Sequence, residues 1–218
     1  MPNHKFLWAV ARQLSILDDG DAPLIETIQN DRRPPNQLVE HFLKGYKLWR
    51  FGGFKSHPRS LDAFIDIAER LFRPKPADSI AASRTWLSAV SEFKGRSHLG
   101  LQYSAFLKFY WFYQPRMLTI YDQYTLKGLR VAEKQLGIQS RPSLIKPENF
   151  LNRFDAVYKR HVHDIREAVS MFNRHYPYER RVLDKYLWLL GNRTDEQKRL
   201  LTAFMASLRL APLHGSTK

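Results

Sequence analysis

The apolar residues of this chain recur with the period of an α-helix along nearly its whole length. In SLDAFIDIAERLF (60–72) they fall three and four residues apart, which places them on one helical face. Ser60 is a natural N-cap for this helix. The same periodicity predicts further helices over 36–49, 77–93, 104–113, 123–136, 147–172, 178–190 and 194–209.

Proline and glycine separate these helices. The loops that they predict are DRRPPN (31–36), RFGGFKSHPRS (50–60), RPKPADS (73–79) and LGIQSRPSLIKPENF (136–150). No alternating strand pattern occurs, although LTIY (118–121) is too short to assign to strand or coil. We therefore expect one compact all-α domain over 1–210, with two helical lobes meeting near 136–150 and a disordered tail over 211–218.

The charge of the chain indicates its class of partner. Lysine and arginine number 35 against 21 acids, which gives a net charge of +14 and a pI near 10.1. A charge of this size favours a polyanion, with nucleic acid ahead of an anionic membrane surface. A basic protein without a specialised partner is the other interpretation. Apolar residues make up 44%, so a packed interior is expected.

Several kinds of chemistry are excluded or unsupported by the residues present. There is no cysteine, which excludes disulfides, cysteine-ligated metals and a cysteine nucleophile and fits a reducing cytoplasm. No run is long and apolar enough for a membrane span, and MPNHKFLWAVARQL is too polar for a signal peptide. His161 and His163 would point to different faces of a helix. We expect no metal, no nucleotide and no other cofactor, because no phosphate-loop, dinucleotide or zinc-protease motif occurs.

Residues 93–124 hold the densest group of candidate functional residues. They read as a helix end, a basic turn with Gly95 and Gly100, an aromatic-rich helix, a Pro-Arg turn and an apolar run before Asp122. Glycine permits close approach to a ligand, and a helix start offers free N–H groups to a phosphate. An ordinary connection between two helices explains the same residues.

Asp122 is the one acid in PRMLTIYDQYTLKGL (115–129). It precedes a predicted helix, and aspartate is a favoured N-cap residue. Residues alone therefore leave two roles open for Asp122, a helix cap and a catalytic carboxylate.

Three stretches together resemble the helix–hairpin–helix DNA glycosylase superfamily, and most closely its branch similar to 8-oxoguanine DNA glycosylase. HLGLQYSAF (98–106) resembles the hairpin, and TIYDQY (119–124) resembles the apolar run that ends in the catalytic aspartate. FLKFYWFYQPRMLTIYDQYTLKGL (106–129) resembles the branch's pattern of a helical lysine, a proline and an isoleucine–aromatic–aspartate before a helix that ends in leucine. More weakly, RRVLDKYLWLLG (180–191) is similar to a C-terminal segment of that branch. The resemblance implies a helix–hairpin–helix element between two lobes, and catalysis by Asp122.

The hairpin also departs from the superfamily pattern. Gln102 occupies the place of the second glycine, and Ser104 occupies the place of the lysine nucleophile in members with lyase activity. The resemblance therefore implies an enzyme that only releases the base. Lys108 lies one helical turn after Ser104. It could act as a nucleophile, pair with Asp122 or hold a phosphate.

A glycosylase site at Asp122 would draw on further residues that lie near it in the sequence. A carboxylate near C1′ would stabilise the positive sugar of the transition state and activate water. Tyr103, Ser104, Tyr121 and Tyr124 are the candidate walls of a pocket for a flipped base. Lys94, Arg96, Gly100, Arg116 and Lys127 are the candidate contacts to DNA.

The leading hypothesis is thus a monomeric DNA glycosylase that acts on a damaged or modified base in duplex DNA. Its biological setting would be base-excision repair or defence against phage DNA with modified bases. Two alternatives remain, a helical protein that binds nucleic acid without catalysis and a helical protein–protein module.

Overall fold

The structure is a computed structural model, and helices joined by loops make up the part of the chain that it describes. That part comprises residues 4–16, 21–30, 32–48, 53–55, 57, 59–97, 99–138, 145–172, 176–192, 194, 199, 202–204 and 206. Its helices are α1 (His4–Ile16), α2 (Ala22–Gln29), α3 (Asn36–Gly45), α5 (Ser60–Phe72), α6 (Ser79–Arg96), α7 (Tyr103–Tyr113), α8 (Gln123–Gln135), α9 (Pro147–Ser170) and α10 (Glu179–Gly191). None of these ranges contains a strand, so the predicted all-α class is confirmed.

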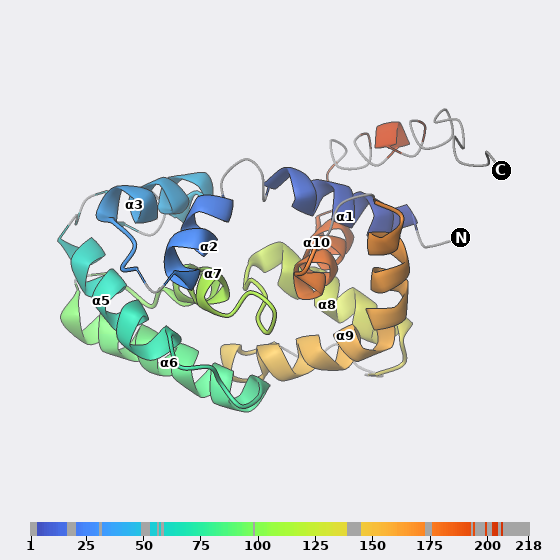
Figure 1. Ribbon diagram of the computed structural model, residues 1–218. Coiled ribbons are helices and arrows are strands. Elements are labelled where there is room, and N and C mark those ends of the chain that lie inside the picture. The colour runs from blue at the N-terminus through green and yellow to red at the C-terminus, as the bar shows by residue number, and fades with distance from the viewer. Residues whose placement is uncertain are drawn as a thin grey trace.

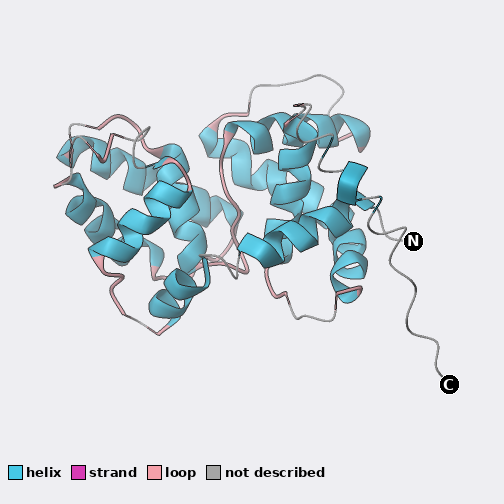
Figure 2. Cartoon of the chain, turned by 90° about the horizontal axis from the view of Figure 1, so that it is seen from above, coloured by secondary structure: helices cyan, strands magenta, loops and turns pink. Residues whose placement is uncertain are grey.

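The helices form two lobes, which are separated most clearly in Figure 2. The α7 lobe consists of α2, α3, α5, α6 and α7, and the α10 lobe consists of α1, α8, α9 and α10 (Figure 1). Packing of α6 against α9 joins the two lobes along one side. The chain passes from the α7 lobe to the α10 lobe through residues 114–122. The predicted meeting point, 136–150, instead follows α8 and precedes α9, which belong to the same lobe.

Helix α7 is the centre of its lobe. All its residues from Ala105 to Tyr113 are buried, as expected of a helix that is apolar around its circumference. Phe64 of α5 lies 4.5 Å from Phe106 between ring centroids, and Phe72 stacks on Tyr110 at 4.1 Å. This aromatic packing fixes the position and rotation of α7, and with them the direction of its side chains.

Helices α8 and α10 are in backbone contact, which requires glycine at positions 128 and 191. A Cβ atom on Gly128 would lie 1.8 Å from the carbonyl oxygen of Leu187. Gly128 lies in α8 and Leu187 in α10, so only a hydrogen in place of a side chain permits this approach. The contact holds the start of α8 against α10.

Two local predictions are wrong. Ser60 is the first residue of α5, and Arg59 occupies the N-cap position, because the turn at His57 already leads into the helix. Lys94, Gly95 and Arg96 belong to the last turn of α6 and not to a loop. The connection to α7 is therefore the shorter segment 97–102.

The other predicted helices that the structure describes in full are present, with ends that differ by up to four residues, as in α3, which was predicted over 36–49. No bounds were predicted for α1 and α2. The ambiguous residues 118–121 have no regular secondary structure. Most of the predicted helix over 194–209 and the whole predicted tail over 211–218 lie outside the described part of the chain.

Candidate functional site

A cavity of about 680 Å³ lies between the two lobes. The α7 lobe contributes residues of α2, α3 and α7, and the α10 lobe contributes residues of α1, α8 and α10. Its charged lining residues are Arg12, Asp21, Lys47, Lys108, Asp122, Asp184 and Lys185. The apolar part of the wall includes Leu24, Leu38, Phe42, Phe112, Ile120 and Trp188. A volume of this size is typical of small-molecule sites, which span roughly 300–1,000 Å³.

Asp122 occupies the N-cap position of α8, as predicted. Its Oδ1 accepts hydrogen bonds from the backbone N–H groups of Tyr124 and Thr125, both at 2.8 Å. Both bonds end on the same oxygen, and Oδ2 has no hydrogen-bond partner among the described residues. The carboxylate is therefore fixed by one oxygen while its side chain lines the cavity.

Lys108 of α7 lines the same cavity and is 8% exposed. Its Nζ donates to Ser104 Oγ at 2.9 Å, and Ser104 Oγ donates to the carbonyl oxygen of Tyr121 at 2.8 Å. Burial lowers the pKa of Lys108, and the charge of Asp122 opposes this shift. The structure thus brings the two predicted catalytic residues to one cavity, with Ser104 positioned to anchor the lysine.

A buried polar network supports this wall of the cavity. Thr125 Oγ1 donates to Asp184 Oδ1 at 2.8 Å, and Arg181 donates to Asp184 Oδ2 at 2.6 Å. Arg181 also donates to the Tyr46 hydroxyl at 3.3 Å, and that hydroxyl donates to Asp21 Oδ2 at 2.9 Å. Burial raises the pKa of Asp184 and that of Asp21. The network connects α8, α10 and α3 across the lobe boundary.

Lys185, the residue after Asp184, supplies a second amine to the cavity. Its Nζ lies 5.4 Å from the ring centroid of Trp188, in a cation–π contact. It forms no ion pair with a carboxylate among the described residues. Burial lowers the pKa of Lys185 to about 8, although Asp184 and Asp122 act in the opposite direction.

The predicted aromatic walls divide into two groups. Tyr124 lines the cavity and packs edge-on against Trp188 at 5.7 Å between ring centroids. Tyr103 and Tyr121 do not line this cavity, because both pack on the other side against Trp86, at 5.9 and 5.2 Å. Tyr103, at the start of α7, thus packs against α6, and Tyr121, in the segment before α8, packs against α6 and against Phe150 of α9.

The predicted DNA contacts are exposed and scattered outside the cavity. Arg96 pairs with Glu92 of the same helix at 2.9 Å, and Lys94 lies two residues before Arg96 on the same turn. Lys127 lies 5.7 Å from the ring centroid of Tyr124, and Arg116 follows α7. Gly100 and Gly95 have no left-handed backbone, and a Cβ on either would meet nothing within 4 Å. Neither position therefore requires glycine for the fold.

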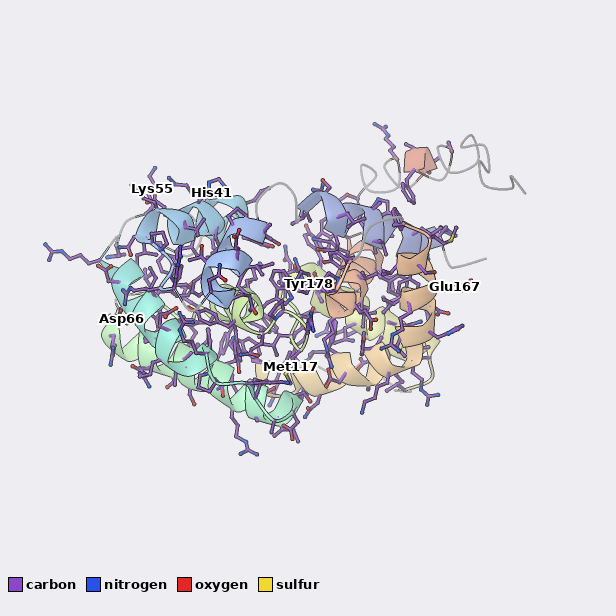
Figure 3. All side chains as sticks on the ribbon, in the orientation of Figure 1. His41, Lys55, Asp66, Met117, Glu167 and Tyr178 are labelled. Carbon is purple, nitrogen blue, oxygen red and sulfur yellow. The ribbon has the colours of Figure 1, made fainter. Side chains whose placement is uncertain are left out.

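Several cavity residues were not found from the sequence. Arg12, Asp21, His41, Tyr46 and Lys47 come from helices and turns in the first 50 residues, which showed no functional motif. Figure 3 places His41 on α3, on the far side of the lobe boundary from α10. Asp184, Lys185 and Trp188 lie in RRVLDKYLWLLG, which was noted for its resemblance but given no role.

Comparison of the chain with protein-family models, curated proteins and solved structures finds no match. In the part of the chain that the structure describes, no group of three or more histidine and acidic side chains is placed to hold a metal ion. Among the same residues, no helix has both the length and the apolarity to cross a membrane.

Proposed function

We propose that the protein is a DNA glycosylase that hydrolyses the N-glycosidic bond of a damaged or modified base in the cavity between its lobes. The observation that carries the proposal is the position of Asp122 and Lys108 on the wall of one cavity, in a protein with a net charge of +14. The resemblance of the sequence to helix–hairpin–helix glycosylases adds support.

The proposed role of Asp122 is electrostatic. Cleavage of the bond between the base and C1′ builds positive charge on the sugar, as in glycoside hydrolysis. Asp122 offers Oδ2 to that charge, while Oδ1 is held by the N–H groups of Tyr124 and Thr125. A carboxylate that is already fixed needs no reorganisation during the reaction. Oδ2 of Asp122 can also accept a proton from the attacking water. Capping and catalysis are thus compatible roles of one side chain.

The proposed role of Lys108 is that of a fixed cation beside Asp122. Its bond to Ser104 Oγ directs Nζ and leaves it two further N–H donors. These donors can bind a polar group of the substrate close to the reacting carbon. A nucleophilic role would need the neutral amine, which burial favours and Asp122 opposes. Sodium borohydride trapping with active enzyme distinguishes the roles, since only a nucleophilic Lys108 leaves a covalent adduct that Lys108→Ala loses.

The cavity is suited to an extruded nucleotide. Enzymes that act on bases in a duplex must rotate the nucleotide out of the stack into a pocket. Trp188, Tyr124 and Phe112 offer ring surfaces in a cavity of about 680 Å³. The positive charge of the whole protein would hold the phosphate backbone outside it.

The test is release of free base from duplexes that carry different damaged and modified bases, with wild-type protein and Asp122→Asn. Asparagine retains an N-cap, so the variant should fold and lose only the carboxylate charge. We expect release by the wild type from at least one duplex and strong loss in the variant. Salt-dependent duplex binding without release from any of them would support the alternative, a nucleic-acid-binding protein without catalysis.

A further inference from the structure

The backbone of Lys47 adopts a conformation that side chains disfavour. Its φ is 59°, and no other non-glycine residue in the described part of the chain has a positive φ. The left-handed region costs an ordinary L-residue roughly 1–2 kcal/mol, and Lys47 is not one of the residues that tolerate it best. The position calls for an explanation in terms of what its side chain does.

Lys47 follows the end of α3, where that conformation is a normal way to stop a helix. Tyr46 N–H bonds to the carbonyl oxygen of Phe42, and Lys47 N–H bonds to that of Lys44 at 2.9 Å. Glycine, and less often asparagine, is preferred at this place because neither is strained there. The fold alone would therefore favour glycine over lysine at position 47.

The side chain of Lys47 lines the cavity and is exposed. Arg12 of α1, in the other lobe, lines the same cavity and is exposed as well. Neither forms an ion pair with a carboxylate among the described residues. Asp21 also lines the cavity, where the Tyr46 hydroxyl shares its one proton between the two carboxylate oxygens, at 3.1 and 2.9 Å. Two cations from opposite lobes, neither of them ion-paired within the part of the chain that the structure describes, thus line the cavity that holds Asp122.

We propose that Lys47 and Arg12 bind a phosphate group of the nucleotide whose base occupies the cavity, so that the site takes a nucleotide and not a nucleoside without phosphate. The identity of the ligand rests on the proposed function, but phosphate binding itself does not require base release. Lys47 keeps its strained position because that position directs its amine to the phosphate.

Lys47 is expected to lower the stability of the fold and to raise the affinity for DNA, so one substitution tests both effects. Lys47→Gly relieves the backbone strain and should raise the melting temperature by about 2–4 °C. The same substitution should weaken binding of a DNA duplex several-fold at low salt. The slope of log affinity against log salt should become shallower by about 1, as for one lost phosphate contact. Arg12→Gln should weaken binding similarly without raising the melting temperature.

Lys55→Ala is the matched control, because it removes one exposed positive charge from the outer side of the α7 lobe (Figure 3). Binding is measured by fluorescence anisotropy of a labelled duplex. Every protein in this comparison also carries Asp122→Asn, so that no base is released during the measurement. If Lys47→Gly binds the duplex as tightly as Lys55→Ala, the phosphate site is refuted. A lower melting temperature in Lys47→Gly would refute the strain argument. A wild type that binds DNA but releases no base would overturn the proposed function and leave the phosphate site standing.

Discussion

A Cβ atom on Gly191 would lie 1.9 Å from the carbonyl oxygen of Tyr124, so α10 and α8 touch through their backbones at this pair. Tyr124 lines the cavity two residues after Asp122, and its N–H group binds the Asp122 carboxylate. The contact therefore fixes the helix start that carries the candidate catalytic group. Any side chain at 191 must displace that helix start.

Gly191→Ala is accordingly expected to destabilise the protein by roughly 1–3 kcal/mol, since backbone atoms cannot yield as a flexible side chain can. Gly95→Ala is the control, because Gly95 lies in α6 and a Cβ there meets nothing within 4 Å. Removing a helical glycine of that kind should stabilise the protein by about 0.5–1 kcal/mol. Urea unfolding measures both. Equal effects of the two substitutions would contradict the close packing of α8 on α10.

Arg181 is fully buried and holds the polar network of the lobe boundary together. Arg181→Met removes the cation that lowers the pKa of Asp184 and Asp21 most, and leaves them with the weaker influence of Lys185, which should cost roughly 3–5 kcal/mol at pH 7. Both carboxyls would then have a still higher pKa in the folded state than in the unfolded state. The folded variant would bind more protons than the unfolded chain, so its deficit should shrink as the pH falls from 7 to 5.

The control for this network is Arg33→Met, which breaks an ion pair with Asp66. The side chains of Arg33 and Asp66 are each 51% exposed. Exposed pairs contribute about 0–1 kcal/mol, and no change with pH is expected there. Unfolding free energies at pH 5 and pH 7 test the difference. A deficit in Arg181→Met that does not depend on pH would argue against two unpaired buried carboxyls.

Lys185 is expected to make stability depend on pH in the alkaline range. Its folded pKa of about 8 lies below the ordinary value of 10.5, so between these two pH values the unfolded chain binds more protons. Stability of the wild type should therefore rise with pH across that window. Lys185→Met should be more stable than the wild type at pH 7, by on the order of 1 kcal/mol, and this advantage should fall at pH 9.5. Lys127→Met, which changes an exposed lysine, provides the comparison. An advantage that is constant from pH 7 to 9.5 would contradict the lowered pKa.

The fold class followed from local periodicity, because a helix with one apolar face repeats its pattern within a few residues. Asp122 as a helix cap was predictable for the same reason, since a cap depends on the residues next to it. The lobe boundary was not predictable, because the proline-containing break at 136–150 is the longer one in the sequence, while the passage at 114–122 has only a short Pro-Arg turn before mostly apolar residues. Gly128 and Gly191 also carried no local signal, since their role depends on a partner helix about 60 residues away.

Only part of the candidate site was predictable from the sequence, because some of its residues are neighbours along the chain and others meet only in the fold. Asp122, Lys108 and Tyr124 belong to consecutive elements, and their spacing was informative. Lys185, Asp184 and Arg12 approach them only through the packing of α10 and α1. Tyr103 and Tyr121 were close to Asp122 in sequence but pack against Trp86, because the direction of the local backbone, and not proximity along the chain, decides which side chains meet the cavity.

The most direct test of the central claim is the single-turnover rate of base release by Asp122→Asn, compared with Asp78→Asn. Asp78 caps α6 through a 2.8 Å bond from Ala81 N–H and does not line the cavity. Both substitutions retain a capping side chain, so they differ in whether a carboxylate is removed from the cavity. The account predicts a loss of at least about 100-fold for Asp122→Asn and a rate near that of the wild type for Asp78→Asn. Equal rates in the two variants on a duplex that the wild type cleaves would contradict a catalytic role for Asp122.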